Sequence, residues 1–471
     1  MADAHPLPRG RIRRTMPLAG FTARAAGGRM VAALQEKSGD AGALQRFHER
    51  TAERYADLLG HSKGVLMKAG QMFSMIDPSV VGMDALSPYQ RALIRLQADA
   101  PPMDPLLARE VLEADLGRDI EEVFGEFTYE PMAAASIGQV HRAVMPDGRA
   151  VVVKIQYPGV AEAIREDLAN TELLTTIIRF VGSTAPGTLP DLRQAAHELS
   201  ERIMEEIDYR HEAANIAAFS ELYRGHPFIR IPEVVADASA DRVLTMTYLA
   251  GLDWAEAQQV EQDVKNAWAE AISRMVTGSY RHANLFHADP HPGNYRFGVD
   301  GTVGFVDFGC VKVLTEPRRR QIVEMARAAV DGNGDKLHEV MTESGFLADD
   351  STLTAQEAYQ WWAAVLHELL VDQPARYSRE SSERAVRALL DVRSREHVVR
   401  RMSVPSDFVF FARLNLSMNA IFVALGAELH ARSLLDDMDG VAEPVTDLGK
   451  QHVAWARERG LPFGMDDHDQ L

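Results

Sequence analysis

The segment from residue 287 to residue 309 constrains this chain more than any other stretch. It contains the run His-Ala-Asp-Pro-His-Pro-Gly-Asn, which ends at Asn294, and Asp-Phe-Gly at residues 307–309. Asp289 has the chemistry to orient or deprotonate an attacking hydroxyl, while Asn294 and Asp307 offer hard oxygen ligands for Mg²⁺. Together these residue types indicate a centre for phosphoryl transfer.

The residues between the two motifs predict a hairpin. Residues 295–297 and 302–306 are expected to form short strands, joined at Asp300-Gly301, a strong two-residue turn. A hairpin centred there places Asn294 opposite Asp307 at its open end, where a shared cation would bind. The order and spacing are those of a kinase catalytic loop followed by a metal loop. The alternative is a polar turn with capping Asp and Asn residues, which is the commoner role of such residues singly.

Bulk properties limit the class of protein. A chain of 471 residues is too long for one core, and 46% apolar with 25% charged residues is ordinary for a globular protein. The net charge of −18 argues against a general nucleic-acid binder. The single cysteine, Cys310, excludes an internal disulfide and is expected to be a small buried thiol. No apolar stretch reaches the roughly 20 residues that span a bilayer.

A second pattern predicts a nucleotide-binding lobe. A small-residue loop is followed by a strand, a turn at Pro146-Asp147-Gly148, and a second strand that carries Lys154. In a kinase such a loop covers the phosphates and such a lysine is aimed at the nucleotide. The loop residues expected to bind nucleotide are Ala133, Ala134, Ala135, Ser136, Gly138 and Gln139. Alanines in place of glycines limit the approach of backbone N–H groups, so nucleotide geometry is expected to be altered.

An acidic helix is predicted from residue 190 to about residue 223. It carries Glu206, Asp208 and Glu212, of which Asp208 and Glu212 share one face. Glu212 is the candidate partner of Lys154, whereas Glu206 and Asp208 are candidates for the phosphate or metal side, or for the Lys68 segment. A solvated acidic face is the alternative.

Three further stretches bear on the predicted nucleotide cleft. Thr247 to Ala250 is the candidate hinge that would contact adenine through backbone groups. After the metal loop, Thr315 with Glu316-Pro317 predicts an immediate helix start, which leaves no room for the activation segment of a peptide kinase. Upstream, Lys68 and Gln71 lie among Met, Leu and Phe on a predicted helix, where polar side chains need partners or face a cleft.

Jointly these motifs resemble the UbiB family of atypical kinases, the AarF type related to mitochondrial coenzyme Q proteins. The resemblance runs from about Lys63 to Val313. It identifies Lys68 and Gln71 with the K-x-G-Q signature, the alanine loop and Lys154 with the family's nucleotide site, and Glu206 and Asp208 with its E-x-D motif. The resemblance implies ATPase activity with little protein phosphorylation, a link to quinone or other isoprenoid-lipid biosynthesis, and a K-x-G-Q region packed over the active cleft.

The expected fold is α+β: a bilobal protein-kinase-like fold with a small β-rich N-lobe, a helical C-lobe and an added N-terminal helical extension. The expected parts are a basic, flexible arm at 1–39, the helical extension at 40–123, the N-lobe at 124–250, the C-lobe with a helical C-terminal extension at 251–458 and an acidic tail, expected to be disordered, at 459–471. Within the C-lobe part, residues 408–435 are predicted to form one helix.

The leading hypothesis is an ATP/ADP- and Mg²⁺-binding atypical kinase or ATPase with Asp289, Lys154 and Glu212 as catalytic residues. Two alternatives stay open: an aminoglycoside-type small-molecule phosphotransferase, and a nucleotide-gated lipid- or protein-binding pseudokinase. Expected partners are a nucleotide, a lipid or quinone-precursor ligand and, through the basic arm, an anionic membrane surface, but no nucleic acid. The expected location is the cytoplasm, with peripheral contact at the inner membrane face.

Overall fold

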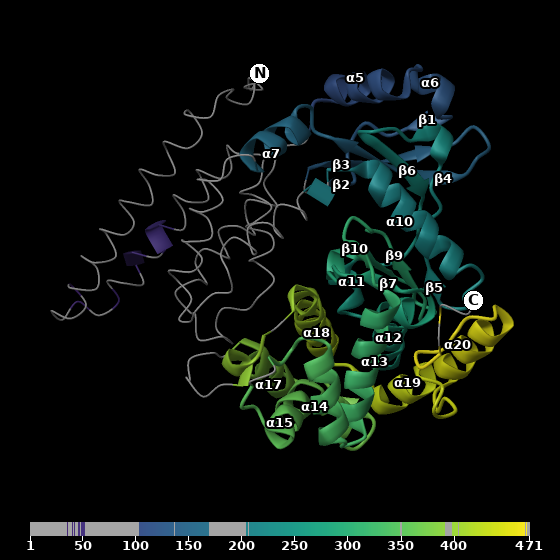
Figure 1. Ribbon diagram of the computed structural model, residues 1–471. Coiled ribbons are helices and arrows are strands. Elements are labelled where there is room, and N and C mark those ends of the chain that lie inside the picture. Colours follow the sequence, from purple (N-terminus) through teal and green to yellow (C-terminus); the bar gives the residue numbers. More distant parts are fainter. Residues whose placement is uncertain are drawn as a thin grey trace. The chain divides into compact units, whose positions relative to one another are not determined.

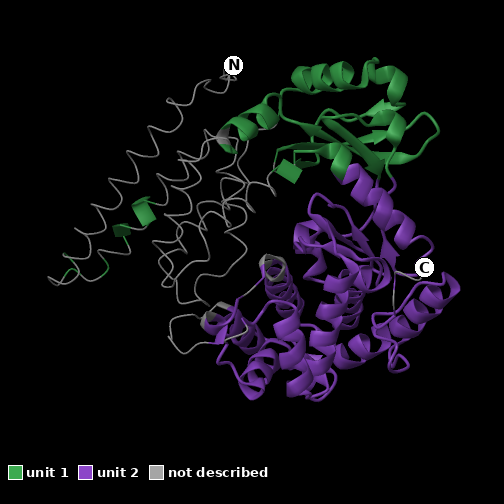
Figure 2. Ribbon diagram, viewed as in Figure 1, with its two compact units in different colours: residues 1–211, 234–247 green, residues 212–233, 248–471 purple. Residues whose placement is uncertain are grey.

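The computed structural model describes residues 103–135, 137–168, 207–348, 351–390, 398–403, 405–466 and 468, with a few residues between 35 and 51 and at 204–205. These residues form two compact units (Figure 2). Unit 1 contains the chain up to His211 and Val234–Thr247, and unit 2 contains Glu212–Glu233 and the chain from Tyr248 onward. The division after Thr247 falls inside the expected hinge. Lys68, Gln71, Ser136 and Glu206 lie outside the described residues.

Unit 1 is built on a five-stranded antiparallel sheet (Figure 1). Its strands pair in the order β1-β3-β4-β6, and β2 also pairs with β3. Their bounds are Glu126–Phe127 (β1), Ala133–Ala135 (β2), Gly138–Val144 (β3), Ala150–Gln156 (β4) and Val243–Thr247 (β6). The predicted β3–β4 hairpin is confirmed: Gly148 has φ +89°, and the carboxylate of Asp147 accepts the backbone N–H of Arg149 over 3.0 Å.

Helix α5 (Pro105–Leu116) packs on β4 and β6 of this sheet (Figure 1). Asp104 caps its first turn, and Gly117 ends it in the left-handed region. Its buried face carries Ala108, Val111 and Leu112. Asp115 then fastens the helix to the start of β6, because its carboxylate accepts both the backbone N–H and Nε of Arg242. Unit 1 also contains α6 (Ile120–Val123), α7 (Val160–Leu168) and the 3₁₀ turn Ala236–Ala238.

Unit 2 is organised around the buried helix α12 (Gln262–Ala283), which carries Trp268, Ile272 and Met275 in its core face. Beside α12 lie two small sheets, β7 (Leu285–His287) with β10 (Val311–Val313), and β5 (Ile229–Arg230) with β9 (Val303–Phe305) and β8 (Tyr295–Phe297). The first sheet joins the catalytic motif to the residues that follow the metal motif.

The remainder of unit 2 is mainly helical (Figure 1). Its helices are α10 (Tyr209–Leu222, which begins in unit 1), α11 (Trp254–Ala257), α13 (Glu316–Val330), α14 (Gly334–Glu343), α15 (Ala355–Val365), α16 (His367–Leu370), α17 (Arg379–Leu390), α18 (Ser406–Leu425), α19 (Ala431–Met438) and α20 (Asp447–Glu458). Short 3₁₀ turns lie at Pro292–Asn294 and Val398–Arg401, and β11 (Ala375–Arg376) pairs with β12 (Glu428–Leu429).

Two sequence expectations are corrected in this half. A helix was expected from residue 408 to residue 435, but α18 ends at Gly426, whose φ of +62° closes the helix, and α19 is separate. The tail expected to be disordered from residue 459 is ordered in its described part. His282 donates to the carbonyl of Pro462 over 2.6 Å, and Arg319 donates to the carbonyls of Gly464 and Asp466. Backbone carbonyls, which composition does not reveal, anchor this segment.

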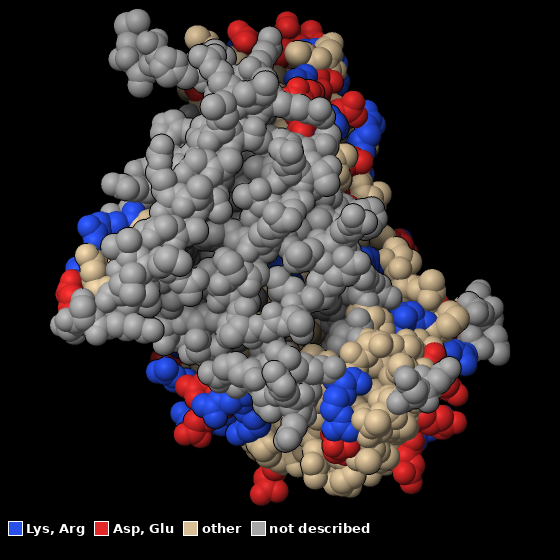
Figure 3. Space-filling model, turned by 60° about the vertical axis from the view of Figure 1, so that its left-hand side comes forward, with Lys and Arg blue, Asp and Glu red and all other residues tan. Residues whose placement is uncertain are grey.

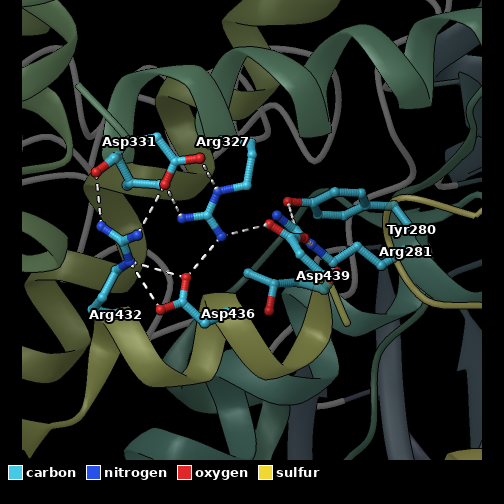
Figure 4. Close-up of polar contacts among 9 residues, drawn as sticks. Tyr280, Arg281, Arg327, Asp331, Arg432, Asp436 and Asp439 are labelled. Carbon is cyan, nitrogen blue, oxygen red and sulfur yellow. Dashed lines mark hydrogen bonds and ion pairs between the residues drawn. The ribbon is translucent and has the colours of Figure 1, made fainter. Parts of the chain in front are cut away.

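A network of arginines and aspartates joins α12, α13 and α19 (Figure 4). Arg281 donates from Nε to Asp439 over 2.7 Å, and both side chains are almost fully buried. Arg327 bridges Asp331 and Asp436, and Arg432 contacts the same two carboxylates from α19. The run Asp436 to Asp439 therefore docks α19 on the central helices. No helix among the described residues is both long and apolar enough to cross a bilayer.

Candidate active site

In unit 1, Lys154 lies on the central strand of the sheet. It pairs in register with Val140 of β3 and with Leu244 of β6, and it is 8% exposed. Strands on both sides hold its backbone, so the position of the Cα is rigid. The predicted strand lysine is therefore in a strand, and its contact with nucleotide stays a prediction.

The alanine loop is a strand hairpin. Ala133 and Ala134 are exposed on β2, which pairs with β3 from Ala133–Val140 to Ala135–Gly138. A Cβ on Gly138 would lie 2.1 Å from the carbonyl oxygen of Ile155. The close approach of β3 and β4 thus requires glycine here, independently of any phosphate.

Gln139 has a structural use that sequence reasoning missed. Its Oε1 accepts the backbone N–H of Met103 over 2.8 Å, and its Nε2 lies 2.8 Å from Nε2 of His141. Because Nδ1 of His141 faces the carbonyl of Thr128 at 2.9 Å, that nitrogen carries the proton and Nε2 accepts from Gln139. Burial lowers the pKa of His141, consistent with this neutral tautomer. The amide of Gln139 is thus bound inside unit 1.

In unit 2, the catalytic loop leaves β7 after His287. The backbone N–H of Ala288 donates to the carbonyl of Cys310 over 2.9 Å, which ties the loop to the residue after Asp-Phe-Gly. Asn294 donates from Nδ2 to the carbonyl oxygen of Asp289 over 3.2 Å. This bond closes the loop and makes Oδ1 the candidate metal ligand of Asn294. Cys310 is buried, as predicted.

The metal loop is held by bonds to its backbone. Nε2 of His287 donates to the carbonyl oxygen of Asp307 over 2.8 Å, and Oδ1 of Asp307 accepts the N–H of Gly309 over 3.0 Å. Phe308 is fully buried, with its ring centre 5.0 Å from that of Phe219 and 5.4 Å from that of His287. These contacts restrict the position of the Asp307 carboxylate.

The hairpin between the two motifs forms, but its predicted register is wrong by one residue. Tyr295 pairs with Phe305 and Phe297 with Val303, and the N–H of Val306 donates to the carbonyl of Asn294 over 3.0 Å. The two-residue turn is replaced by a longer loop in which Asp300 accepts from Thr302. Asn294 is thus opposite Val306, and Asp307 is the next residue along the chain.

Helix α10 also departs from expectation. The structure breaks the predicted helix 190–223 before Tyr209, where Oδ1 of Asp208 accepts the N–H groups of Arg210 and His211 over 3.0 Å. Asp208 is therefore the N-cap of a new helix, and capping competes with any role toward phosphate. Glu212 is 5% exposed on the first turn of that helix. Its pairing with Lys154, which belongs to unit 1, stays a prediction.

Sequence reasoning missed two residues at this site. Asn215, one helical turn after Glu212, donates to the carbonyl of Phe308 over 2.9 Å. Arg413 of α18 donates from Nη2 to Oδ1 of Asp289 over 2.5 Å. The buried hydroxyl of Tyr295 has no hydrogen-bond partner among the described residues. The pKa of this hydroxyl is raised, mainly by burial and secondly by the negative charge of Asp289.

The donor set of unit 2 fits Mg²⁺. Mg²⁺ is usually held by one or two protein oxygens, with water and substrate phosphates completing the octahedron. Asn294 and Asp307 provide such a pair, and the described residues contain no cluster of three His, Cys, Asp or Glu side chains that would hold a metal by themselves. When bound, Mg²⁺ would neutralise phosphate charge at this edge.

Comparison with known proteins decides the family. The model of the ABC1 atypical kinase-like domain matches residues 95–341. The chain belongs to the ABC1 atypical kinase family. The mitochondrial atypical kinase COQ8B of Rattus norvegicus is 29% identical over 97% of the chain and 83% of the rat protein. The chloroplastic ACTIVITY OF BC1 COMPLEX KINASE 8 of Arabidopsis thaliana is 32% identical over 61% of the chain, but only 38% of that protein is covered.

A solved structure agrees with the fold. The Mycobacterium tuberculosis protein Rv3197, in complex with erythromycin, has a TM-score of 0.60 and 31% identity, covering 88% of this chain and 99% of that one. The α+β, kinase-like fold and the UbiB-type membership expected from the motifs are confirmed. The chain is an atypical kinase-like enzyme.

Proposed function

We propose that the protein is an ATP-binding, Mg²⁺-dependent atypical kinase or ATPase of the UbiB type that supports quinone or other isoprenoid-lipid metabolism. The observation that carries the proposal is the arrangement of Asp289, Asn294 and Asp307. All three lie in loops fixed by hydrogen bonds to neighbouring backbone groups. Phosphoryl transfer depends mainly on such positioning and on charge.

The proposed reaction uses these residues as follows. An attacking oxygen, from water or a small acceptor, forms a bond to the γ-phosphorus of ATP while the bond to the β,γ-bridging oxygen breaks and its electron pair leaves with ADP. Asp289 orients the attacking hydroxyl and takes its proton. Lys154 holds the phosphates, with Glu212 orienting the lysine, and Asn294 and Asp307 hold the metal.

The chain segment after the metal loop disfavours a peptide acceptor. Only residues 310–315 separate Gly309 from the start of α13 at Glu316, and part of that segment pairs with β7 as β10. A peptide kinase needs a longer segment here to dock its substrate. A small-molecule or lipid acceptor, or water, is therefore favoured.

The test is phosphate release by the full chain with Mg²⁺-ATP. Asp307→Ala should abolish nearly all turnover, whereas Asp300→Ala, which removes another carboxylate of the same hairpin, should retain it. Turnover is then compared with and without anionic liposomes and phenolic quinone precursors. Stimulation supports the lipid-pathway proposal, and retained turnover in Asp307→Ala rejects the catalytic assignment.

A small-molecule phosphotransferase is the second candidate. It is favoured by the description of the Mycobacterium tuberculosis relative as a complex with erythromycin. Transfer of labelled phosphate to a macrolide or aminoglycoside would establish it. Tight nucleotide binding with no turnover and no transfer would instead favour a nucleotide-gated binding protein.

A peripheral contact with an anionic membrane remains part of the proposal. The arginines of the basic arm that would make it lie outside the described residues. On the described part of the face in Figure 3, acidic and basic side chains are interspersed. Vesicle flotation of the full chain, with neutral vesicles as the control, would test this contact.

A further inference from the structure

The chain that leaves the candidate hinge joins the outer edge of β8, the edge that does not pair with β9. The N–H of Leu252 donates to the carbonyl of Phe297 over 2.8 Å, and the N–H of Phe297 donates to the carbonyl of Leu252 over 3.0 Å. Leu249, within the hinge, packs on the face of the β8–β9 ribbon, because a Cβ on Gly304 would lie 3.1 Å from its Cδ1. All four residues belong to unit 2, so the second half of the hinge is held against this ribbon.

Arg296 lies on the same face of the ribbon as Leu249. Its neighbours in β8, Tyr295 and Phe297, are fully buried, so the alternation of a strand turns Arg296 to the opposite face, where it is partly exposed. It pairs in register with Gly304, and a Cβ on that glycine would lie 3.4 Å from the Cβ of Arg296. The aliphatic stem of the arginine is therefore next to the hinge.

The guanidinium of Arg296 turns toward the catalytic loop. Nη1 donates to the carbonyl of Tyr295 over 2.7 Å and to that of Gly293, the residue before the candidate metal ligand Asn294, over 3.3 Å. Carbonyls two residues apart in a strand point to the same edge, so that of Tyr295 faces the outer edge of β8, as that of Phe297 does. The guanidinium is thus at the outer edge, between the hinge and the loop that ends at Asn294.

These two bonds engage only one nitrogen of the guanidinium. Both come from Nη1, whereas Nε and Nη2 have no hydrogen-bond partner among the described residues, and no described carboxylate forms an ion pair with Arg296. Nε and Nη2 form one edge of the planar fork, with parallel N–H groups that suit two oxygens side by side. Capping two carbonyls needs one nitrogen, which a lysine would also supply, so capping does not account for this second edge.

The side of β8 on which the guanidinium lies decides which part of a nucleotide it meets. A nucleotide bound as proposed has its base at the hinge and its phosphates at Asn294 and Asp307, so its ribose lies between them. Because β9 leads into Asp307 and pairs with the inner edge of β8, the guanidinium is on the side away from the metal loop. The 2′- and 3′-hydroxyls of ribose present two neighbouring oxygens that accept from such a fork of N–H donors.

We propose that Arg296 is a specificity-determining residue that binds the 2′- and 3′-hydroxyls of the nucleotide ribose through Nε and Nη2. It distinguishes a ribonucleotide from a deoxyribonucleotide, while Nη1 caps the outer edge of β8. This assignment rests on the proposed function, because the candidate hinge and metal ligands set the position of the nucleotide.

The test compares ATP with 2′-deoxy-ATP and 3′-deoxy-ATP, each with Mg²⁺, in the full chain. Isothermal titration gives Kd, and phosphate release gives kcat and KM. Loss of a hydrogen bond from a charged donor typically weakens binding about tenfold or more, so each deoxynucleotide should bind that much more weakly than ATP. Arg296→Met keeps an apolar stem without donors. In this variant ATP should lose about tenfold or more in Kd and KM, and its advantage over both deoxynucleotides should disappear, with kcat changed only a few-fold.

Arg230→Met is the matched control. Arg230 pairs with Gly304 from the other side of β9, and its Nη2 donates to the carbonyl of Pro227 over 3.0 Å, so it also caps backbone carbonyls of this sheet. The variant should keep both the affinity for ATP and the preference for ribose. An equal change in Arg230→Met and Arg296→Met would show that loss of any capping arginine is responsible, and would overturn the proposal.

Three other results would also overturn it: equal binding of the three nucleotides by the parent chain, a preference for ATP that survives in Arg296→Met, or an equal loss for all three nucleotides in that variant. The last result would assign Arg296 to the phosphates or to the loop. A parent chain that prefers ATP in binding but releases no phosphate rejects the proposed turnover and leaves the ribose contact standing, whereas a parent chain that binds no nucleotide rejects both.

Discussion

Asn215 of α10 donates a hydrogen bond to the carbonyl oxygen of Phe308, the residue that follows the candidate metal ligand Asp307. One helix therefore carries both Glu212, the candidate partner of the nucleotide lysine, and the amide that fixes the metal loop. The ring of Phe219, one turn further along α10, packs on the ring of Phe308. Helix α10 thus links the position of the metal loop to the position of Glu212.

Replacing Asn215 with alanine should loosen the metal loop. Loss of one hydrogen bond costs about 0.5–1.5 kcal/mol. Because the bond fixes Phe308, the Mg²⁺ concentration for half-maximal turnover should rise several-fold. Urea denaturation and an Mg²⁺ titration of phosphate release measure the two effects.

Asn333→Ala is the control for this change. Asn333 caps α14 by accepting the N–H of Lys336 over 3.0 Å, and loss of such a cap costs about 1 kcal/mol. Its stability loss should match that of Asn215→Ala, with an unchanged Mg²⁺ requirement. An equal Mg²⁺ shift in both variants would show that general destabilisation is responsible.

The features predicted well from sequence are those encoded locally. The strand of Lys154, the β3–β4 turn and the immediate start of α13 depend on side-chain alternation, turn residues and Thr-Glu-Pro, which act within a few residues. The start of α10 was not predicted, because Asp208 lies within a sequence pattern that is otherwise helical and the pattern does not show that this residue acts as a cap. The predicted register of the hairpin was wrong because Asp300 accepts a hydrogen bond from Thr302 and the loop is longer.

Arg413 could not have been assigned from sequence motifs, because its partner lies on another element. One signal was present: Arg413 is the only charged residue between Asp407 and Glu428. A lone arginine in an apolar helix needs a buried or functional partner. Which partner it finds depends on tertiary packing that no local pattern specifies.

Gly138→Ala separates a packing role from a phosphate-binding role. A Cβ there would meet the carbonyl oxygen of Ile155 at 2.1 Å, so β3 and β4 must move apart. Overpacking of this kind costs about 1–3 kcal/mol, and more when backbone must shift. In the absence of nucleotide, we expect Gly138→Ala to have a lower free energy of unfolding than the parent chain. Gly125→Ala, where the nearest atom lies at 3.4 Å, should be much milder. Weakened nucleotide binding at unchanged stability would indicate the phosphate role instead.

Asp439→Asn should be severely destabilising, because it leaves the buried guanidinium of Arg281 without its carboxylate (Figure 4). Breaking a buried ion pair by removing one partner costs about 3–5 kcal/mol. Asp331→Asn in the same network is the matched comparison. The side chain of Asp331 is 49% exposed, so its loss should cost at most about 1 kcal/mol. Similar losses of unfolding free energy in both variants would refute the importance of burial.

Three buried histidines form a hydrogen-bonded chain that joins α12 and α20. Nδ1 of His226 accepts the backbone N–H of Ile229, so its Nε2 carries the proton and donates to Nδ1 of His452 over 3.0 Å. Nε2 of His452 then donates to Nε2 of His282 over 3.1 Å, and Nδ1 of His282 donates to the carbonyl of Pro462. Every nitrogen has one consistent role only while all three rings are neutral.

Acid should therefore destabilise the folded chain. Burial lowers the pKa to about 2 for His226, to about 4 for His282 and well below the usual value for His452, and the nearby Arg274 adds to this in each case. In the unfolded chain these imidazoles take up protons near pH 6.5, so below that pH the unfolded state binds more protons. The stabilisation is complete above pH 6.5 and falls by about 1.4 kcal/mol per histidine for each pH unit below it.

Urea denaturation at pH 7.5 and pH 5.5 measures this dependence. His452→Gln should lower stability at pH 7.5 but reduce the pH slope, because one titrating group is gone. Trp455→Phe perturbs the same cluster, where the indole lies edge-on 4.4 Å from the His226 ring centre, without removing a titrating group. It should lower stability by a similar amount at both pH values. An identical pH slope in the parent chain and His452→Gln would contradict the neutral chain of histidines.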